Sequence, residues 1–331
     1  MAAGTLQPQS DAGAIGAARG FVGGETVRKV APVVVLIALV VALGLFEPSF
    51  LSFYSLSVLA GESSIILLLA TAQTVVILLG CIDLSMAALA SLASVLVALA
   101  LPSAGLAGVG GVLALTTAIG AIQGAIHAKA QVPSFVVTLA GLGLCSGAAL
   151  AISPATIPVS GGYEWVGWLR LKLFNLPYSF LLAASLLVIL GLALRFLPFG
   201  RQVYAIGMGE AATLLSGVRV ARVKIAAFAL TGLFSGLAGL MFVARTRGGH
   251  PGIADSLLLP AIAAVVVGGT AITGGSGSVW RTFAGVLIIA VLRVGIAIVG
   301  LDPGYEPLAY GAVIVAAVAL TIDRTKTTIV K

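Results

Sequence analysis

Residues 84–128 read LSMAALASLASVLVALALPSAGLAGVGGVLALTTAIGAIQGAIHA, which is 45 residues without Asp, Glu, Lys or Arg. The hydrocarbon core of a bilayer needs about 20 apolar residues per helix, so a run of this length predicts two membrane-spanning helices. A turn is expected at residues 102–105, where Pro102 and Gly105 interrupt the run. This stretch alone indicates a membrane protein whose chain crosses the bilayer at least twice as helices.

The rest of the chain has the same character. Of 331 residues, 18 are Lys or Arg and 11 are Asp or Glu, so only 9% are charged, against roughly 25% in soluble domains. Hydrophobic residues make up 60%, and the mean hydropathy is +1.18. A soluble protein could not cover its surface with this composition, and a disordered chain would be far less hydrophobic. The predicted fold class is an all-α polytopic membrane protein.

The other uncharged runs extend this to about ten transmembrane helices. They are expected near residues 30–46, 62–80, 83–101, 106–128, 133–152, 178–197, 223–243, 257–273, 282–301 and 306–322. Residues 1–29 are expected to form a largely disordered cytoplasmic tail ahead of a transmembrane domain at 30–331.

Loop charges predict the orientation, because cytoplasmic loops carry an excess of Lys and Arg. With the N-terminus inside, 13 cations lie on the inner side, and the outer side keeps only Arg170, Lys172, Arg245 and Arg247. Both termini are therefore expected in the cytoplasm.

A possible internal repeat accompanies this pattern. VVILLGCIDLS at 75–85 is echoed 190 residues later by VVVGGTAITGG at 265–275. Each segment is an apolar span that ends in a break rich in Gly, Ser or Thr. Two halves of five spans each would lie in opposite orientations, so the pattern predicts inverted repeats with broken helices. The alternative is two ordinary loops in an apolar chain.

Several kinds of chemistry have no motif here. The chain lacks GxxxxGK[ST], HExxH and GxSxG, so no catalytic residue and no metal site is predicted. His127 and His250 are not at metal-ligand spacing. Cys81 and Cys145 lie in apolar runs and are expected to be small buried hydrophobic residues. No voltage-sensor helix or potassium-channel filter is present, which disfavours an ion channel.

A few polar residues within the spans are candidates for a transport pathway: Gln73, Asp83, Ser85, Gln123, Thr270 and Arg293. Each has a structural alternative. Asp83 can cap the following helix, Arg293 can pair with a backbone carbonyl or extend to the interface, and uncharged polar groups can hold helices together. GxxxG spacings at 120–124, 143–147 and 232–236 predict close helix contacts.

The inner loop at 198–222 carries the densest basic cluster. Glu210 is expected in the first turn of a short helix that Gly217 ends, with a turn at Gly207 and Gly209. Such a helix could be held by a soluble partner. The alternative, a helix lying at the lipid interface, predicts more Lys and Arg on its polar face.

Five segments in this order resemble the permease subunits of bacterial ABC sugar importers of the ribose/xylose type, whose superfamily also includes branched-chain amino-acid and nucleoside permeases. The segments are GCIDLS (80–85), VPSFVVTL (132–139), PFGRQVYAIG (198–207), AIAAVVVGGT (261–270) and GGSGSV (274–279), and EAA (210–212) with SG (216–217) lies between the third and the fourth. The resemblance covers most of the chain beyond the first 30 residues.

The resemblance implies an importer subunit in the bacterial inner membrane. Its expected partners are a second permease subunit (the same chain or a different one), a cytoplasmic ATP-binding subunit and a periplasmic sugar-binding protein. ATP and Mg would be bound by the ATPase, with no cofactor on this chain and no nucleic acid. The coupling helix would comprise Glu210, Ala211, Ala212, Leu215, Ser216 and Gly217.

The sequence also departs from this family. Four residues separate Ala212 from Gly217, where other importer families have three. Leu257–Pro260 stands where many relatives carry acidic residues, and Arg293 replaces an expected neutral residue. The expected function is import of a neutral sugar of the pentose or hexose class. The alternatives are a permease for another small solute, such as a nucleoside or branched-chain amino acid, an ion-coupled secondary transporter, or a structural or channel-like membrane protein.

Overall fold

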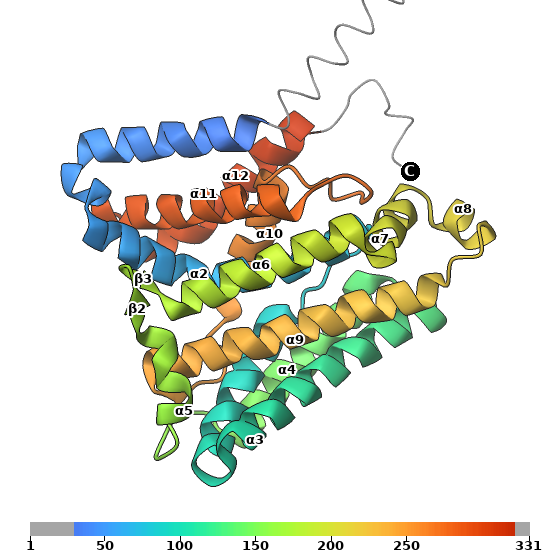
Figure 1. Ribbon diagram of the computed structural model, residues 1–331, viewed down its shortest axis with the longest axis horizontal. Helices are drawn as coiled ribbons and strands as arrows, with labels where there is room; N and C mark the ends of the chain where they lie inside the picture. The colour runs from blue at the N-terminus through green and yellow to red at the C-terminus, as the bar shows by residue number, and fades with distance from the viewer. Residues whose placement is uncertain (1–29, 322–331) are drawn as a thin grey trace, which may run out of the picture.

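The computed structural model describes residues 30–321, which are mostly helical (Figure 1). The expectations for the tail at 1–29 and for the last residues lie outside this range. Within residues 30–321, six helices are long and apolar enough to cross a membrane. They are α2 (Phe53–Leu78), α3 (Met86–Lys129), α4 (Ser134–Ile152), α6 (Tyr178–Phe196), α9 (Val220–Thr246) and α11 (Val279–Ile298).

Three shorter apolar helices accompany them: Val30–Phe46, α10 (Leu258–Val267) with the preceding 3-10 turn η3 (Asp255–Leu257), and α12 (Glu306–Thr321). The predicted helical membrane fold is confirmed. The count of ten spans stays a prediction, because these three helices fall below the length of a full span and α3 is bent into two limbs at Gly105.

The predicted turn at 102–105 is a kink inside α3. Gly105 has φ 51° and ψ −132°, and Pro102 lies one turn before it. A proline removes an intrahelical hydrogen bond, and glycine alone adopts such backbone angles without strain. A Cβ at Gly105 would lie 3.1 Å from Trp165 Nε1. Two limbs of α3 therefore meet at this bend, which a loop tryptophan covers.

Two predicted boundaries were wrong. The span expected at 62–80 begins at Phe53, because Glu62 is accommodated inside α2 by an ion pair with Arg245 and does not mark a helix end. The span expected at 257–273 ends at Val267, since Gly268 and Gly269 turn the chain out of α10. Of the turn expected at Gly207 and Gly209, Gly209 separates two helices, whereas Gly207 lies in the last turn of the first of them, α7 (Pro198–Met208).

The most extensive contact between two helices in the described residues is that of α3 with α9. A Cβ at Gly120 would lie 3.1 Å from the Gly232 Cα and would overlap the Phe228 carbonyl oxygen. One at Gly232 would overlap the Thr116 carbonyl oxygen. Two of the three GxxxG pairs are thus opposed to each other across this interface, as close helix contact requires.

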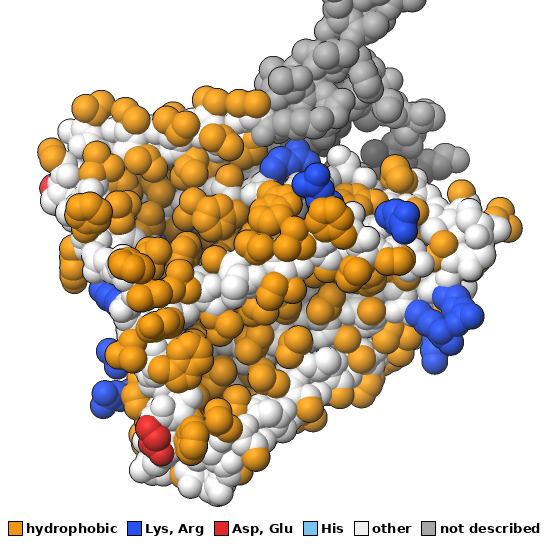
Figure 2. Space-filling view, viewed as in Figure 1, with side chains coloured by type: hydrophobic (Ala, Val, Ile, Leu, Met, Phe, Trp, Pro, Cys, Tyr) orange, Lys and Arg blue, Asp and Glu red, His pale blue; other side chains and the backbone are white. Residues whose placement is uncertain are grey.

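Apolar side chains cover most of the face shown in Figure 2, and Lys and Arg side chains gather at its edges. In α2, 89% of the apolar window is buried within the chain, whereas in α4 and α6 the share is 28%. No atom lies within 4 Å of a Cβ built at Gly143 or Gly147, the third GxxxG pair. These two helices therefore present their apolar surface to the surroundings of the chain.

The two ends of the bundle differ (Figure 1). One end, which we call the strand end, carries α5 (Glu164–Gly167), the 3-10 turn η2 (Trp168–Arg170) and two short antiparallel strand pairs. Strand β1 (Ile157–Pro158) pairs with β4 (Gly248–Gly249), and β2 (Lys172–Leu173) with β3 (Leu176–Pro177). The other, the α8 end, carries α7 and α8 (Glu210–Leu215). Two more 3-10 turns, η1 (Pro48–Leu51) and η4 (Pro303–Tyr305), complete the described elements.

The long loop at the strand end is tied to the helices. Tyr163 donates a hydrogen bond of 2.6 Å from its hydroxyl to the Ala244 carbonyl. The Arg247 guanidinium lies 4.9 Å from the centre of the Tyr163 ring, within cation–π range. The loop at 153–177 is therefore folded over the end of α9.

Candidate functional site

The short helix α8 projects from its end of the bundle (Figure 1). Leu215 is 89% exposed, and Met208 and Leu214 are also exposed. Gly217 follows with φ +82° and no atom within 4 Å of a built Cβ. Exposed apolar side chains on a six-residue helix are suited to insertion into a groove of another protein.

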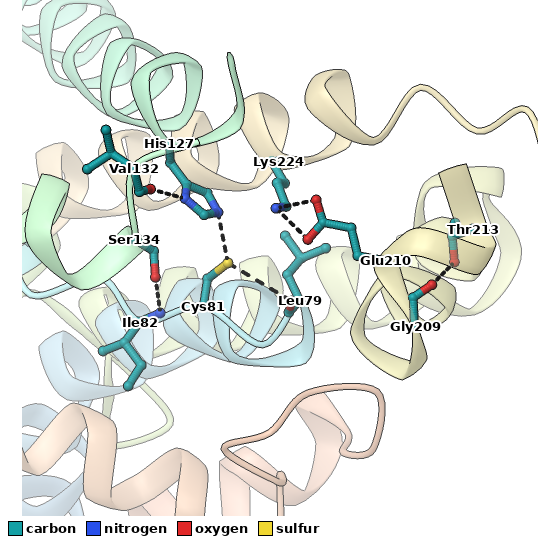
Figure 3. Close-up of polar contacts among 10 residues, drawn as sticks. All are labelled: Leu79, Cys81, Ile82, His127, Val132, Ser134, Gly209, Glu210, Thr213 and Lys224. Carbon is teal, nitrogen blue, oxygen red and sulfur yellow. Dashed lines mark hydrogen bonds and ion pairs between the residues drawn. The ribbon is translucent and has the colours of Figure 1, made fainter. Parts of the chain in front are cut away.

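An ion pair joins α8 to α9. Both carboxylate oxygens of Glu210 accept hydrogen bonds of 2.7 Å from Lys224 Nζ (Figure 3). The Lys224 side chain is 7% exposed and that of Glu210 is 54% exposed. Sequence reasoning treated Lys224 only as a loop charge. The sequence does place Lys224 directly before the apolar run of α9, and a cation buried there needs a partner of opposite charge.

The end of α7 lies directly against two other chain segments. Gly207 fits so closely that a Cβ would overlap the Leu78 carbonyl oxygen and the Gly275 amide. Gly275 donates a hydrogen bond of 2.9 Å to that same Leu78 carbonyl. Tyr204 donates from its hydroxyl to the Gly277 carbonyl at 3.2 Å, and burial raises the pKa of Tyr204. Helix α7 is thereby fixed to the end of α2 and to the loop after α10.

The two segments echoed in the sequence end in the same hydrogen-bonded turn. The backbone amide of Cys81 donates to the Val76 carbonyl at 3.0 Å, and the backbone amide of Thr270 donates to the Val265 carbonyl at 3.2 Å. These equivalences give an offset of 189 residues, one fewer than the offset read from the sequence. A Cβ at Gly274 would lie 2.9 Å from the Gly80 Cα, so the two breaks are in contact.

Three of the candidate pathway residues lie together. Asp83 Oδ1 accepts hydrogen bonds from the Ser85 amide at 2.8 Å and the Ser85 hydroxyl at 2.7 Å. Gln123 Oε1 lies 2.9 Å from the same hydroxyl. All three side chains are buried. Because Ser85 is the N-cap of α3, Asp83 binds the residue directly before the first residue of the helix. The cluster fixes the α2–α3 break to the second limb of α3.

The other candidates are placed elsewhere. Gln73, in α2, is fully buried, and neither atom of its side-chain amide has a hydrogen-bond partner. The Thr270 hydroxyl is also buried without a partner. Arg293 lies near the far end of α11 in a separate ion-pair network. The six predicted residues therefore form one cluster and three separate positions.

Near the Glu210–Lys224 pair, a cysteine and a histidine connect α2 with α3 (Figure 3). Cys81 Sγ lies 3.3 Å from His127 Nε2, and His127 Nδ1 lies 2.7 Å from the Val132 carbonyl. The carbonyl requires Nδ1 to carry the proton, so Nε2 accepts from the thiol. Both cysteines are free and buried, as predicted. The described residues contain no group of three potential ligands that could hold a metal ion.

At the strand end, Arg293 belongs to an ion-pair network across four helices. It lies 3.6 Å from Glu62 of α2 and 3.3 Å from Glu306 of α12. Glu62 also pairs with Arg245 of α9, and Tyr310 donates its hydroxyl proton to Glu306. This explains a charge so close to the middle of a predicted span, since each of these groups has a partner of opposite charge or a hydrogen bond.

A cavity of about 380 Å³ adjoins this network. Its lining includes Glu62, Arg170, Lys172 and Arg245 together with the serines Ser57, Ser64 and Ser179. The hydroxyl of Ser57 is buried without a partner. This end of the chain thus offers a concavity lined by charged, serine and apolar side chains, and the opposite end an apolar projection.

Replacement of Arg293 by leucine should destabilise the protein. Glu62 would keep Arg245, but Glu306 would keep only the Tyr310 hydroxyl. Because the groups are partly exposed, we expect a loss of about 1–2 kcal/mol, less than for a fully buried pair. Arg293→Lys, which keeps the charge, should lose less. Thermal unfolding in detergent measures both, and an Arg293→Leu protein as stable as wild type would contradict the network's role.

Comparison with known proteins places these features in a family. Residues 55–318 match the model described as the branched-chain amino acid transport system / permease component. The chain is 36% identical to the ribose import permease protein RbsC of Bacillus subtilis (strain 168) over 310 residues, 90% of this chain and 94% of that protein.

Two further relatives come from Escherichia coli (strain K12). RbsC is 32% identical over 86% of this chain and 91% of its own length. The D-allose transport system permease protein AlsC is 29% identical over 86% and 89%. No solved structure matches. On the strength of the family match over most of its length, the chain belongs to the branched-chain amino acid transport system / permease component family.

Proposed function

We propose that this chain is the permease subunit of an ATP-driven importer and forms the pathway for a neutral sugar of the pentose or hexose class. The similarity to ribose and D-allose permeases over nearly the whole chain carries this proposal. The chain is a transport component, and ATP hydrolysis belongs to a separate subunit that binds ATP and Mg. Few charged side chains lie within the spans, which suits an uncharged cargo.

The partners follow from the two ends of the bundle. Helix α8, with its exposed leucines, would dock on the cytoplasmic ATPase, and both chain termini would lie on that side. The strand end would face the periplasm and receive the sugar-binding protein. A second permease copy or a different permease would complete the pathway in the inner membrane. We propose ten spans, in which the two limbs of α3 are counted separately and the three short apolar helices are included. We also propose that the spans form two inverted halves.

Transport by such a subunit requires two states with different contacts, biased by ATPase closure. The junction of Gly207, Leu78 and Gly275 supports coupling between α8 and the broken segments, because α7 cannot move without displacing both breaks. The buried, unpartnered amide of Gln73 supports a role on the pathway, since such a group gains a hydrogen bond when water or solute reaches it.

The test is ATP hydrolysis by the reconstituted complex with a panel of sugar-loaded binding proteins. We expect stimulation by a binding protein loaded with a pentose or hexose, and none by one loaded with a nucleoside or branched-chain amino acid. Uptake into the same liposomes should require ATP and survive an uncoupler. Uptake that needs an ion gradient and no ATPase would contradict the proposal and favour a secondary transporter.

A further inference from the structure

Lys224 occupies an unusual position for a lysine. Its side chain is 7% exposed, and its ammonium group binds both oxygens of the Glu210 carboxylate. A buried charge is strongly destabilising without its partner, so this ion pair constrains where Glu210 can lie. Because Lys224 is buried, it has no surface to offer a docked protein.

Helix α8 depends on contacts outside itself for its position. Six residues are too few for a helix that is stable on its own. Gly209 precedes α8, and Gly217 follows it after Ser216. A Cβ built at Gly217 would meet no atom within 4 Å. Its packing partners are α7 and α9, and the bond from Glu210 to Lys224 joins it to α9.

The backbone of α9 at Lys224 is packed tightly on α3. A Cβ at Gly124 would lie 2.9 Å from the Ile225 Cα and 3.3 Å from the Lys224 carbonyl oxygen. One turn further along α3, His127 meets Cys81 at the end of α2 (Figure 3). A displacement of α9 at this level therefore acts on α3 and on the α2–α3 break.

We propose that Lys224 is a positioning residue for energy coupling, which transmits movement of α8 through its ion pair with Glu210 into α9 and α3. The inference rests on the proposed function, since it assumes that α8 docks on an ATPase. It distinguishes two roles for the same loop. The exposed leucines of α8 hold the ATPase, and the buried lysine passes the movement on.

The experiment uses the complete complex of permease, ATPase and binding protein in liposomes. Lys224→Met keeps the length of the side chain and removes its charge. Lys224→Arg keeps the charge, and Lys129→Gln removes an exposed cation from the same end of the bundle. Three quantities are measured: co-purification of the ATPase, stimulation of ATP hydrolysis by the loaded binding protein, and sugar transported per ATP.

We expect Lys224→Met to retain the ATPase while stimulation falls by about tenfold, within the usual range for coupling between two sites. Lys224→Arg should retain most of the stimulation, and Lys129→Gln should behave as wild type. Loss of the ATPase from the Lys224→Met complex, with its fold intact, would overturn the division of roles. Unchanged stimulation in the Met variant would overturn the inference.

A second variant keeps the test decisive if Lys224→Met does not fold. The double substitution Glu210→Gln with Lys224→Met removes both charges together, so no carboxylate is left without its partner. We expect this protein to assemble and to remain uncoupled, and full coupling in it would overturn the inference. If wild type itself shows no stimulation by any binding protein, it is the proposed function that fails.

Discussion

Gly207→Ala should abolish transport, although it adds only one methyl group. A Cβ at this position would overlap the Leu78 carbonyl oxygen and the Gly275 amide, and both are backbone atoms that cannot rotate away. The methyl group would separate α7 from the end of α2 and break the fit between Leu78 and Gly275. Overpacking of this kind costs about 1–3 kcal/mol in stability. We expect uptake in reconstituted liposomes to fall by more than tenfold.

Gly209→Ala is the matched control, two residues further along, at the C-cap of the same helix. Its backbone is extended, with φ 179°, and the nearest atom to a built Cβ is the Ala212 Cβ at 3.9 Å. This variant should transport at the wild-type rate with an unchanged Tm. Equal activity of the two variants would show that the close approach at Gly207 is not needed for transport. Equal loss would show that a glycine at the end of α7, and not the close contact at Gly207, is what matters.

The positions of the helices were predictable because uncharged runs report the length of chain that the bilayer must hold. That rule fails where a charge lies inside a helix beside a partner distant in sequence. Glu62 was taken as the limit of a span, yet α2 begins nine residues earlier and Glu62 pairs with Arg245, 183 residues away. A single sequence does not reveal such a pair, because nothing local distinguishes a paired charge from a boundary.

The candidate site was predictable where local chemistry decides it. Glu210 at the start of a short helix and Gly217 after its end follow from helix-terminus preferences. The buried partner of Glu210 does not follow from them, because Lys224 is brought to it only when α9 folds back beside α8. The contact between Gly80 and Gly274 is likewise tertiary, although the similar sequences around both breaks indicated that each would end a helix.

Gly232→Val should have the largest effect on folding of any single substitution considered. Its side chain would enter the α3–α9 interface against the Thr116 carbonyl oxygen and the Thr117 Cα, where the backbones are already in contact. Between membrane helices, close packing supplies much of the association energy, so forcing the helices apart removes the contacts along both. We expect a loss of about 3 kcal/mol or more and little folded protein in detergent.

Gly147→Val tests whether this effect comes from position or merely from the loss of a glycine in a membrane helix. Gly147 belongs to a GxxxG pair of the same spacing on α4, but a built Cβ there meets no atom within 4 Å. The added side chain would extend away from the protomer, so we expect its Tm and yield to match wild type. A large loss of folded protomer in both variants would contradict the packing argument. Loss in Gly232→Val alone identifies the α3–α9 contact as an interface on which the protomer's fold depends.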